Sequence, residues 1–181
     1  MIVSLRGTNG AGKSTIVRNI MALYFNRFQI EYPGRRRPGG YILRPRHVDG
    51  TRLFVPGHYE IANGGVDTLP SLDAAYELIR VHAVEFGCDV LYEGKNMSDG
   101  PKRLLELSRH GLPVAVGHIH IPVKECVAAV RKRGHTIKKE TIERLSVKCV
   151  RDAETFATAG VEVFTGDREA VFNQVRKWLG V

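Results

Sequence analysis

A glycine-rich stretch near the start of the chain, residues 7–15 with the sequence GTNGAGKST, constrains the fold more than any other feature. It follows the short apolar run MIVSL, which is typical of a buried strand. Apolar residues at helical spacing come after it, from Ile16 to Tyr24. The stretch is therefore expected to form a tight turn between a first strand and a first helix. Its spacing matches G-x-x-x-x-G-K-[ST], the pattern of a loop that binds the phosphates of a nucleotide.

The residue types in this loop meet the physical demands of triphosphate binding. The backbone must curl around the phosphates and offer them N–H donors, and Gly7, Gly10 and Gly12 permit that curl. Lys13 can reach the β- and γ-phosphates, and the Ser14 hydroxyl can ligate Mg²⁺ at the start of the helix. We therefore expect a nucleoside triphosphate to bind to Gly7, Thr8, Asn9, Gly10, Ala11, Gly12, Lys13, Ser14 and Thr15.

The composition restricts the class of protein further. The chain has 181 residues, and 43% of them are hydrophobic, but no apolar run approaches the roughly 18 residues of a membrane span. The N-terminus enters the first strand directly, so we expect neither a membrane span nor a signal peptide, and a cytoplasmic location. The three cysteines are widely spaced and form no CxxC pair, which favours buried thiols over disulfides or zinc. The net charge of +8 favours a polyanionic partner.

Strand-like and helix-like segments alternate along most of the chain. This alternation predicts an α/β fold with three layers, in which a mostly parallel central sheet is covered on both faces. We expect one domain over residues 1–181, of the P-loop nucleotide-kinase-like kind, with the nucleotide beyond the carboxyl ends of the strands. A basic β-hairpin is expected as an insertion at about residues 29–57, with strand-like segments at 29–32, 41–48 and 52–56.

Two acidic residues are the leading candidates for the chemistry. Glu93 ends the buried apolar strand at 89–93, where a carboxylate can hold Mg²⁺ beside Ser14, although a strand end can also carry a purely structural glutamate. Asp67 lies in a glycine-rich loop that would let a substrate approach closely, so it is the leading candidate to accept the proton of the acceptor. A turn-forming role for Asp67 is nearly as well supported. Glu60 and Asp49 are weaker candidates for the base.

Basic residues gather in two further segments. Arg131 and Arg133 end a helix that follows the strand at 114–121, at the position of a lid over the phosphates, at about residues 131–139. Cations that complement a helix end are the structural alternative. The second segment spans residues 35–52 and contains one acid and six arginines among glycines and prolines. Its arginines are suited to forked contacts with DNA phosphates, although a solvated surface is the alternative: Arg35, Arg36, Arg37, Arg44, Arg46 and Arg52.

Four stretches together resemble a family of bacteriophage P-loop kinases, most closely the 5-hydroxymethyluracil DNA kinases of thymine hypermodification. They are RGTNGAGKST at the N-terminus, GHYEIANGGVDT at 57–68, VLYEGK at 90–95 and HIPVKECVAAVRKRG at 120–134. The similarity covers nearly the whole chain, and the phosphate-binding loop is its specific motif. The resemblance implies ATP-dependent phosphorylation of the hydroxymethyl group of a base already in DNA.

Two other functions remain compatible with the residues. A deoxynucleoside monophosphate kinase would act on free nucleotides and needs only one or two arginines for its acceptor. A nucleic-acid-binding ATPase would use water as its only acceptor. A DNA-directed kinase must also reach a base that is flipped out or unpaired. Aromatic candidates to stack on that base, all equally compatible with the core, are Phe54, His58, Tyr59 and Tyr92.

Overall fold

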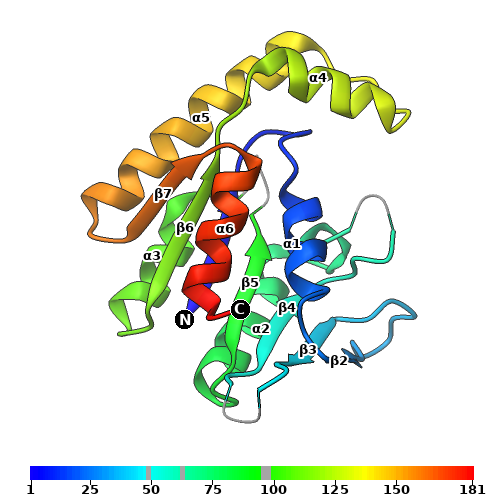
Figure 1. Ribbon diagram of the computed structural model, residues 1–181, viewed down its shortest axis with the longest axis vertical. Coiled ribbons are helices and arrows are strands. Elements are labelled where there is room, and N and C mark those ends of the chain that lie inside the picture. The colour runs from blue at the N-terminus through cyan, green and yellow to red at the C-terminus, as the bar shows by residue number, and fades with distance from the viewer. Residues whose placement is uncertain (48–49, 62–63, 95–98) are drawn as a thin grey trace.

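The computed structural model describes all residues except 48–49, 62–63 and 95–98 (Figure 1). Its centre is a seven-stranded sheet in the order β2-β3-β4-β5-β1-β6-β7. The strands are β1 (Ile2–Arg6), β2 (Asn26–Ile30), β3 (Gly40–Arg44), β4 (Leu53–Pro56), β5 (Asp89–Glu93), β6 (Val114–Ile119) and β7 (Glu162–Gly166). The helices are α1 (Lys13–Met21), η1 (Val66–Thr68), α2 (Leu72–Val84), α3 (Pro101–Arg109), α4 (Val123–Lys132), α5 (Lys139–Thr158) and α6 (Arg168–Leu179).

Five neighbouring strands are parallel, from β4 through β5, β1 and β6 to β7. Strands β1 and β6 are buried along their whole length, as expected for short apolar runs with helices on both sides. Because the strands are parallel, their carboxyl ends meet at one edge of the sheet. The loops after β1 and β5 therefore open at the same place. This arrangement confirms the predicted mostly parallel α/β fold.

Helices cover both faces of the sheet (Figure 1). Helices α1 and α6 pack on one face, and α2, α3 and α5 pack on the other. Each face has its own apolar core. Ile16, Val17 and Ile20 of α1 contribute to the first core, and Ile79 of α2 and Phe156 of α5 contribute to the second.

The segment at 29–57 differs in detail from the prediction. β2 begins at Asn26 and ends at Ile30, three residues earlier at its start than expected and two earlier at its end. Its residues Asn26 to Gln29 are exposed, so no alternation of apolar and polar residues marked its bounds. β3 ends at Arg44 rather than at residue 48, because Pro45 has no N–H to continue the ladder. β3 pairs antiparallel with β4, and β2 pairs antiparallel with β3, so the two strands extend the sheet beyond β4.

In the part of the chain that the structure describes, no helix combines the length and the apolar character needed to cross a bilayer.

Candidate active site

The phosphate-binding loop connects β1 to α1 in a conformation that depends on glycine. Gly10 and Gly12 adopt φ angles of 84° and 103°, in the left-handed region that side chains rarely enter. A Cβ atom on Gly10 would lie 2.3 Å from the carbonyl oxygen of Cys126. Gly12 also caps the N-terminus of α1, so the first N–H groups of that helix face the space enclosed by the loop.

The Lys13 side chain is buried and turns back over the loop. Its Nζ donates to the carbonyl oxygens of Gly7 at 2.8 Å and Thr8 at 3.1 Å. Burial lowers the pKa of Lys13, and the nearby Glu93 carboxylate opposes this shift. The ammonium thus lies at the loop where phosphates are expected, held by carbonyl oxygens that anionic phosphates can replace as its partners.

Ser14 and Glu93 meet at the carboxyl ends of β1 and β5. The Ser14 hydroxyl lies 2.9 Å from Oε1 and 2.8 Å from Oε2 of Glu93. Glu93 is only 8% exposed, and this burial raises its pKa, while Lys13 and the Ser14 hydroxyl oppose the shift. A buried carboxylate beside a hydroxyl is a suitable oxygen donor set for Mg²⁺.

Asp67 lies in η1, directly after the glycine turn that closes on Glu93. A Cβ atom on Gly65 would lie 2.2 Å from Glu93 Oε1, so the turn and the carboxylate are in close contact. Neighbouring bonds hold the turn: the Thr68 hydroxyl donates to the Gly65 carbonyl at 2.7 Å, and Arg35 Nη1 donates to the Thr68 carbonyl at 2.7 Å. Asp67 itself is exposed and its charge acts on both Lys13 and Glu93.

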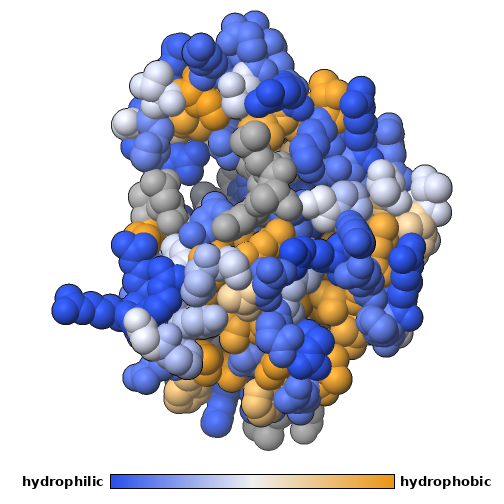
Figure 2. Space-filling model, turned by 180° about the vertical axis from the view of Figure 1, so that it is seen from behind, coloured by the Kyte–Doolittle hydropathy of each residue, from blue (hydrophilic) through white to orange (hydrophobic). Residues whose placement is uncertain are grey.

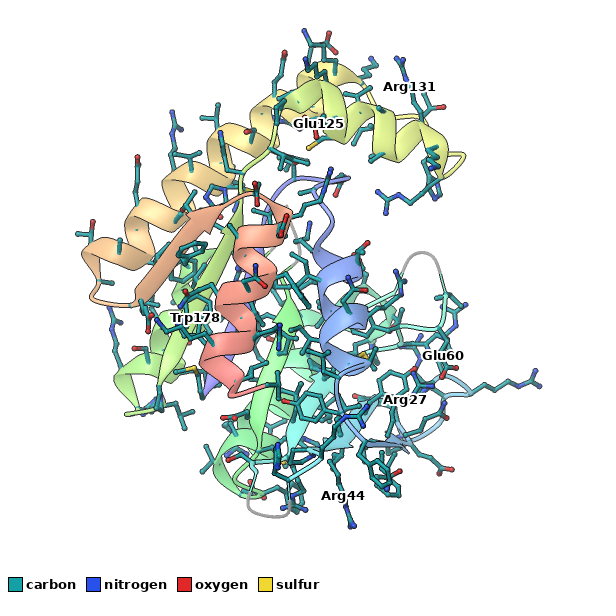
Figure 3. The ribbon with its side chains drawn as sticks, viewed as in Figure 1. Arg27, Arg44, Glu60, Glu125, Arg131 and Trp178 are labelled. Carbon is teal, nitrogen blue, oxygen red and sulfur yellow. The ribbon has the colours of Figure 1, made fainter. Side chains whose placement is uncertain are left out.

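The structure describes one of the two weaker candidates for the base, Glu60, and it lies away from the cavity. Glu60 accepts from Arg27 at 3.1 Å and from Gln29 at 3.3 Å near the edge strand β2. Figure 3 shows Arg27 and Glu60 facing each other on the outside of the molecule. Asp49 lies outside the described residues.

The segment between α4 and α5 lies above the phosphate-binding loop (Figure 1). Arg133 and Lys132 line the cavity below it. Arg131 is exposed and points away from the loop on the outer side of α4, as Figure 3 shows. The structure therefore brings one of the two expected lid arginines to the cavity.

These parts enclose one open cavity of about 1150 Å³. It unites the loop, the end of β5, the turn with Asp67 and the region between α4 and α5. Its lining consists of Thr8, Asn9, Gly10, Gly12, Lys13, Ser14, Thr15, Arg18, Gly64, Asp67, Glu93, Gly94, Ala129, Val130, Lys132, Arg133, His135, Thr136, Ile137 and Arg168.

Two lining arginines were not predicted from the sequence. Arg18 lies one turn after Ser14 on α1 and donates to the carbonyl oxygens of Tyr59 at 2.9 Å and Ile61 at 2.7 Å. Arg18 could have been predicted from the sequence, because residues four positions apart on a helix lie on the same face and Ser14 faces the site. Arg168 Nε donates to the carbonyl oxygen of Ala11 at 3.0 Å, and the two residues are 157 positions apart. No local pattern marks such a contact.

The six arginines of residues 35–52 do not form one surface. Because β2 and β3 are antiparallel, the loop that carries Arg35, Arg36 and Arg37 lies at the cavity end of the sheet. Arg44 and Arg46 lie at the opposite end, where Arg46 Nε donates to the Leu23 carbonyl at 3.4 Å. Arg52 precedes β4 at this same end.

Most of the aromatic candidates for base stacking belong to the core. Phe54, Tyr59 and Tyr92 are at most 3% exposed, so they are not available to a base. Of the two alternatives left open for these rings, the core holds for all three: Phe54 and Tyr92 pack in the core under α2, and Tyr59 packs in the core under α1. His58 is half-buried and its Nδ1 lies 2.9 Å from the Tyr41 hydroxyl.

A parallel sheet, a phosphate-binding loop before α1 and a second acidic residue at the end of β5 define a P-loop phosphotransferase architecture. No family model matches the chain. It is 33% identical over 186 residues to a 5-hmdU DNA kinase of Pseudomonas phage PaMx11, covering 98% of this chain and 96% of the relative. The chain belongs to the 5-hmdU DNA kinase family, as its motifs indicated.

Other similarities are more distant. A 5-hmdU DNA kinase of Bacillus phage SP10 is 24% identical over 197 residues, which cover 99% of this chain and 29% of the relative. Two solved structures of deoxyadenosine kinase from M. mycoides have 13% and 14% identity. The first, with products bound, has a TM-score of 0.48 and covers 99% of both chains. The second, with bound dATP, has a TM-score of 0.47 and covers 100% of both.

Proposed function

We propose that this protein transfers the γ-phosphoryl group of ATP to the hydroxymethyl oxygen of 5-hydroxymethyluracil in DNA. The observation that carries the proposal is the end-to-end similarity to a 5-hmdU DNA kinase. One cavity that joins the phosphate-binding loop to Asp67 supports it, since a kinase must hold the phosphoryl donor and the acceptor side by side. Because its substrates are DNA and ATP, we expect the enzyme to act in the cytoplasm, which for a phage-encoded protein is that of the host cell.

Different residues of this cavity have different roles in the reaction. The loop amides and Lys13 hold the β- and γ-phosphates and offset their charge. The hydroxymethyl oxygen attacks the γ-phosphorus, the bond to the β-phosphate oxygen breaks, and ADP leaves. Asp67 accepts the proton of the attacking hydroxyl, because it faces the same cavity as Lys13. The products are a phosphate ester of the modified base and ADP.

Mg²⁺ fits the pair formed by Ser14 and Glu93. The hydroxyl and the buried carboxylate supply oxygen atoms, and the carboxylate has a negative charge that a divalent cation would compensate. Ser14 and Glu93 would hold the ion, and when bound it would neutralise negative charge that develops on the phosphates.

The lid in this proposal consists of the segment between α4 and α5. Arg133 and Lys132 line the cavity from above, and their charges are available to the transferred phosphoryl group. Arg131 acts at most indirectly, because its side chain points outward. Arg168 is a positioning residue, since it donates to the carbonyl oxygens of Ala11 and Gly10 and so fixes the shape of the loop.

The acceptor enters beside the turn with Asp67. Arg36 and Arg37 are exposed on the loop at this end of the sheet, and they bind phosphates of the DNA next to the modified base. Arg35 has a second task, because its bond to the Thr68 carbonyl holds the turn in place.

Transfer of radiolabel from γ-labelled ATP tests the proposal. Three acceptors are compared: DNA that contains 5-hydroxymethyluracil, the corresponding free deoxynucleotide, and water alone. Label is expected in the modified DNA and is expected to be absent from matched DNA with thymine. Preferential labelling of the free nucleotide would indicate a nucleotide kinase, and release of phosphate alone would indicate an ATPase.

A further inference from the structure

One face of the sheet extends past the helix that covers it. Helix α2 packs on β4 and β5, and its His82 ring stacks on Phe54 of β4 at a centroid distance of 3.5 Å. Beyond β4 the sheet continues through β3 to the edge strand β2. Figure 2, the view from behind, shows hydrophobic side chains between hydrophilic ones on the lower part of this side.

Two exposed aromatic rings lie on this side. Phe28 pairs with Ile42, and Ile42 pairs with Phe54, so all three side chains point to the same face as α2. Phe28 is 47% exposed. Phe86 follows α2, is 51% exposed, and its ring centroid lies 5.3 Å from that of His82.

Each of these two phenylalanines has an arginine beside it. The Arg44 guanidinium lies 5.2 Å from the centroid of the Phe28 ring. Arg52 Nη2 donates to the carbonyl oxygen of Phe86 at 3.0 Å. Both arginines are exposed. We refer to Phe28, Arg44, Arg52 and Phe86 as the aromatic–arginine surface.

We propose that the aromatic–arginine surface binds a single-stranded segment of DNA that flanks the modified base. Bases stack on Phe28 and Phe86, while Arg44 and Arg52 pair with the phosphates. The inference rests on the proposed function, in which DNA is the acceptor. It adds a site at the opposite end of the sheet from the cavity, and it specifies unpaired DNA, because a base in a duplex has no free face for stacking.

The charges on and near this surface favour an anionic partner over a second copy of the chain. Glu85, the nearest acid along the chain to Phe86, lies 3.3 Å from Arg80, which offsets its charge. Asp89 pairs with the N-terminal ammonium at 2.5 Å. Two copies joined at this surface would bring arginines together, whereas a nucleic acid supplies both phosphates and aromatic bases.

The fold connects this surface to the cavity. Strand β2 runs from Asn26, opposite Arg44, to Ile30, opposite Gly40, at the cavity end. The loop that follows carries Arg35, which contacts Thr68 beside Asp67. A strand of DNA along β2 and β3 would therefore reach from the aromatic–arginine surface to the turn with the proposed base.

Fluorescence anisotropy with a labelled thymidine oligonucleotide, without ATP and without modified bases, tests this inference. Phe28→Ala should weaken binding by about fivefold or more, as expected for the loss of one stacked base. Phe28→Trp should retain binding, because it keeps a ring. Val147→Ala removes an equally exposed apolar side chain from α5 and should bind as the wild type does.

Two controls separate stacking from charge. An oligonucleotide of abasic sites should bind equally to the wild type and to Phe28→Ala. Arg44→Gln should reduce the slope of log Kd against log salt by about 0.7, the value for one phosphate contact on a single strand.

Unchanged thymidine binding by Phe28→Ala would refute the inference, as would an equal loss on the abasic oligonucleotide. A wild-type dimer that Phe28→Ala dissociates would also refute it, and would assign the surface to a second copy. Label transfer to free nucleotides alone would instead refute the proposed function, and the binding assay detects stacking independently of that result.

Discussion

At the residue scale, the position of Lys13 indicates that its side chain contributes to phosphoryl transfer and little to the stability of the fold. Its ammonium is buried against the carbonyl oxygens of Gly7 and Thr8, and burial lowers its pKa, so the folded chain gains little from its charge. Lys13→Ala should therefore reduce phosphoryl transfer by about 10²–10³-fold and leave the thermal unfolding midpoint nearly unchanged. Label transfer and calorimetry measure the two quantities. The exposed Lys124→Ala is the control, and near-normal turnover of Lys13→Ala would contradict the role of the loop.

Asp67 and Glu60 form a matched pair of acids for the second prediction. Asp67 faces the cavity, whereas Glu60 pairs with Arg27 outside it. Asp67→Asn should reduce turnover by roughly 10²-fold with little change in the affinity for ATP, because general base catalysis has about that size. Glu60→Gln should keep turnover near the wild-type value. The opposite result, with turnover lost in Glu60→Gln alone, would move the base to Glu60.

At the element scale, the loop between β2 and β3 can be tested without disturbing the turn that holds Asp67. Arg36 and Arg37 are exposed, whereas Arg35 bonds to the Thr68 carbonyl. Replacing Arg36 and Arg37 by Ala should raise the KM for DNA and reduce the salt slope of DNA binding by about 1.4, while the KM for ATP stays the same. Arg35→Ala should additionally lower kcat. Parallel salt plots for the wild type and the double variant would show that these arginines only contact solvent.

His118 of β6 makes stability depend on pH. Burial lowers its pKa to about 4, and His120 adds to this shift while Asp152 opposes it. The unfolded state therefore binds a proton on His118 more tightly than the folded state does. The contribution of His118 to the free energy of unfolding is complete above about pH 6.5. It declines as the pH falls toward 4, by at most about 3 kcal/mol. His118→Asn should flatten this decline in denaturant titrations. His110→Asn, on the exposed end of α3, should leave it unchanged, and equal pH curves for all three proteins would contradict the assignment.

At the scale of the whole molecule, local sequence patterns predicted most of the sheet. They also predicted the two parts of the site that bind ATP, which are the phosphate-binding loop and the acidic residue at the end of β5. The alternation of apolar strands and amphipathic helices predicted the mostly parallel sheet, and it placed Ser14 and Glu93 at the same end of that sheet. The edge strand β2 was misplaced because it buries almost nothing. Arg168 was missed because its contact with the loop depends on the packing of α6, and the division of the six arginines between two ends depends on strand direction.

The central claim is that one cavity brings ATP to a hydroxymethylated base within DNA. Mass spectrometry of nucleosides, after digestion of modified DNA that was incubated with ATP and the protein, tests this most directly. The account predicts one added phosphate on 5-hydroxymethyldeoxyuridine with the wild-type protein, and very little with Asp67→Asn at equal protein concentration. Phosphate found only at the 5′ ends of the DNA, or only on added free nucleotides, would contradict it.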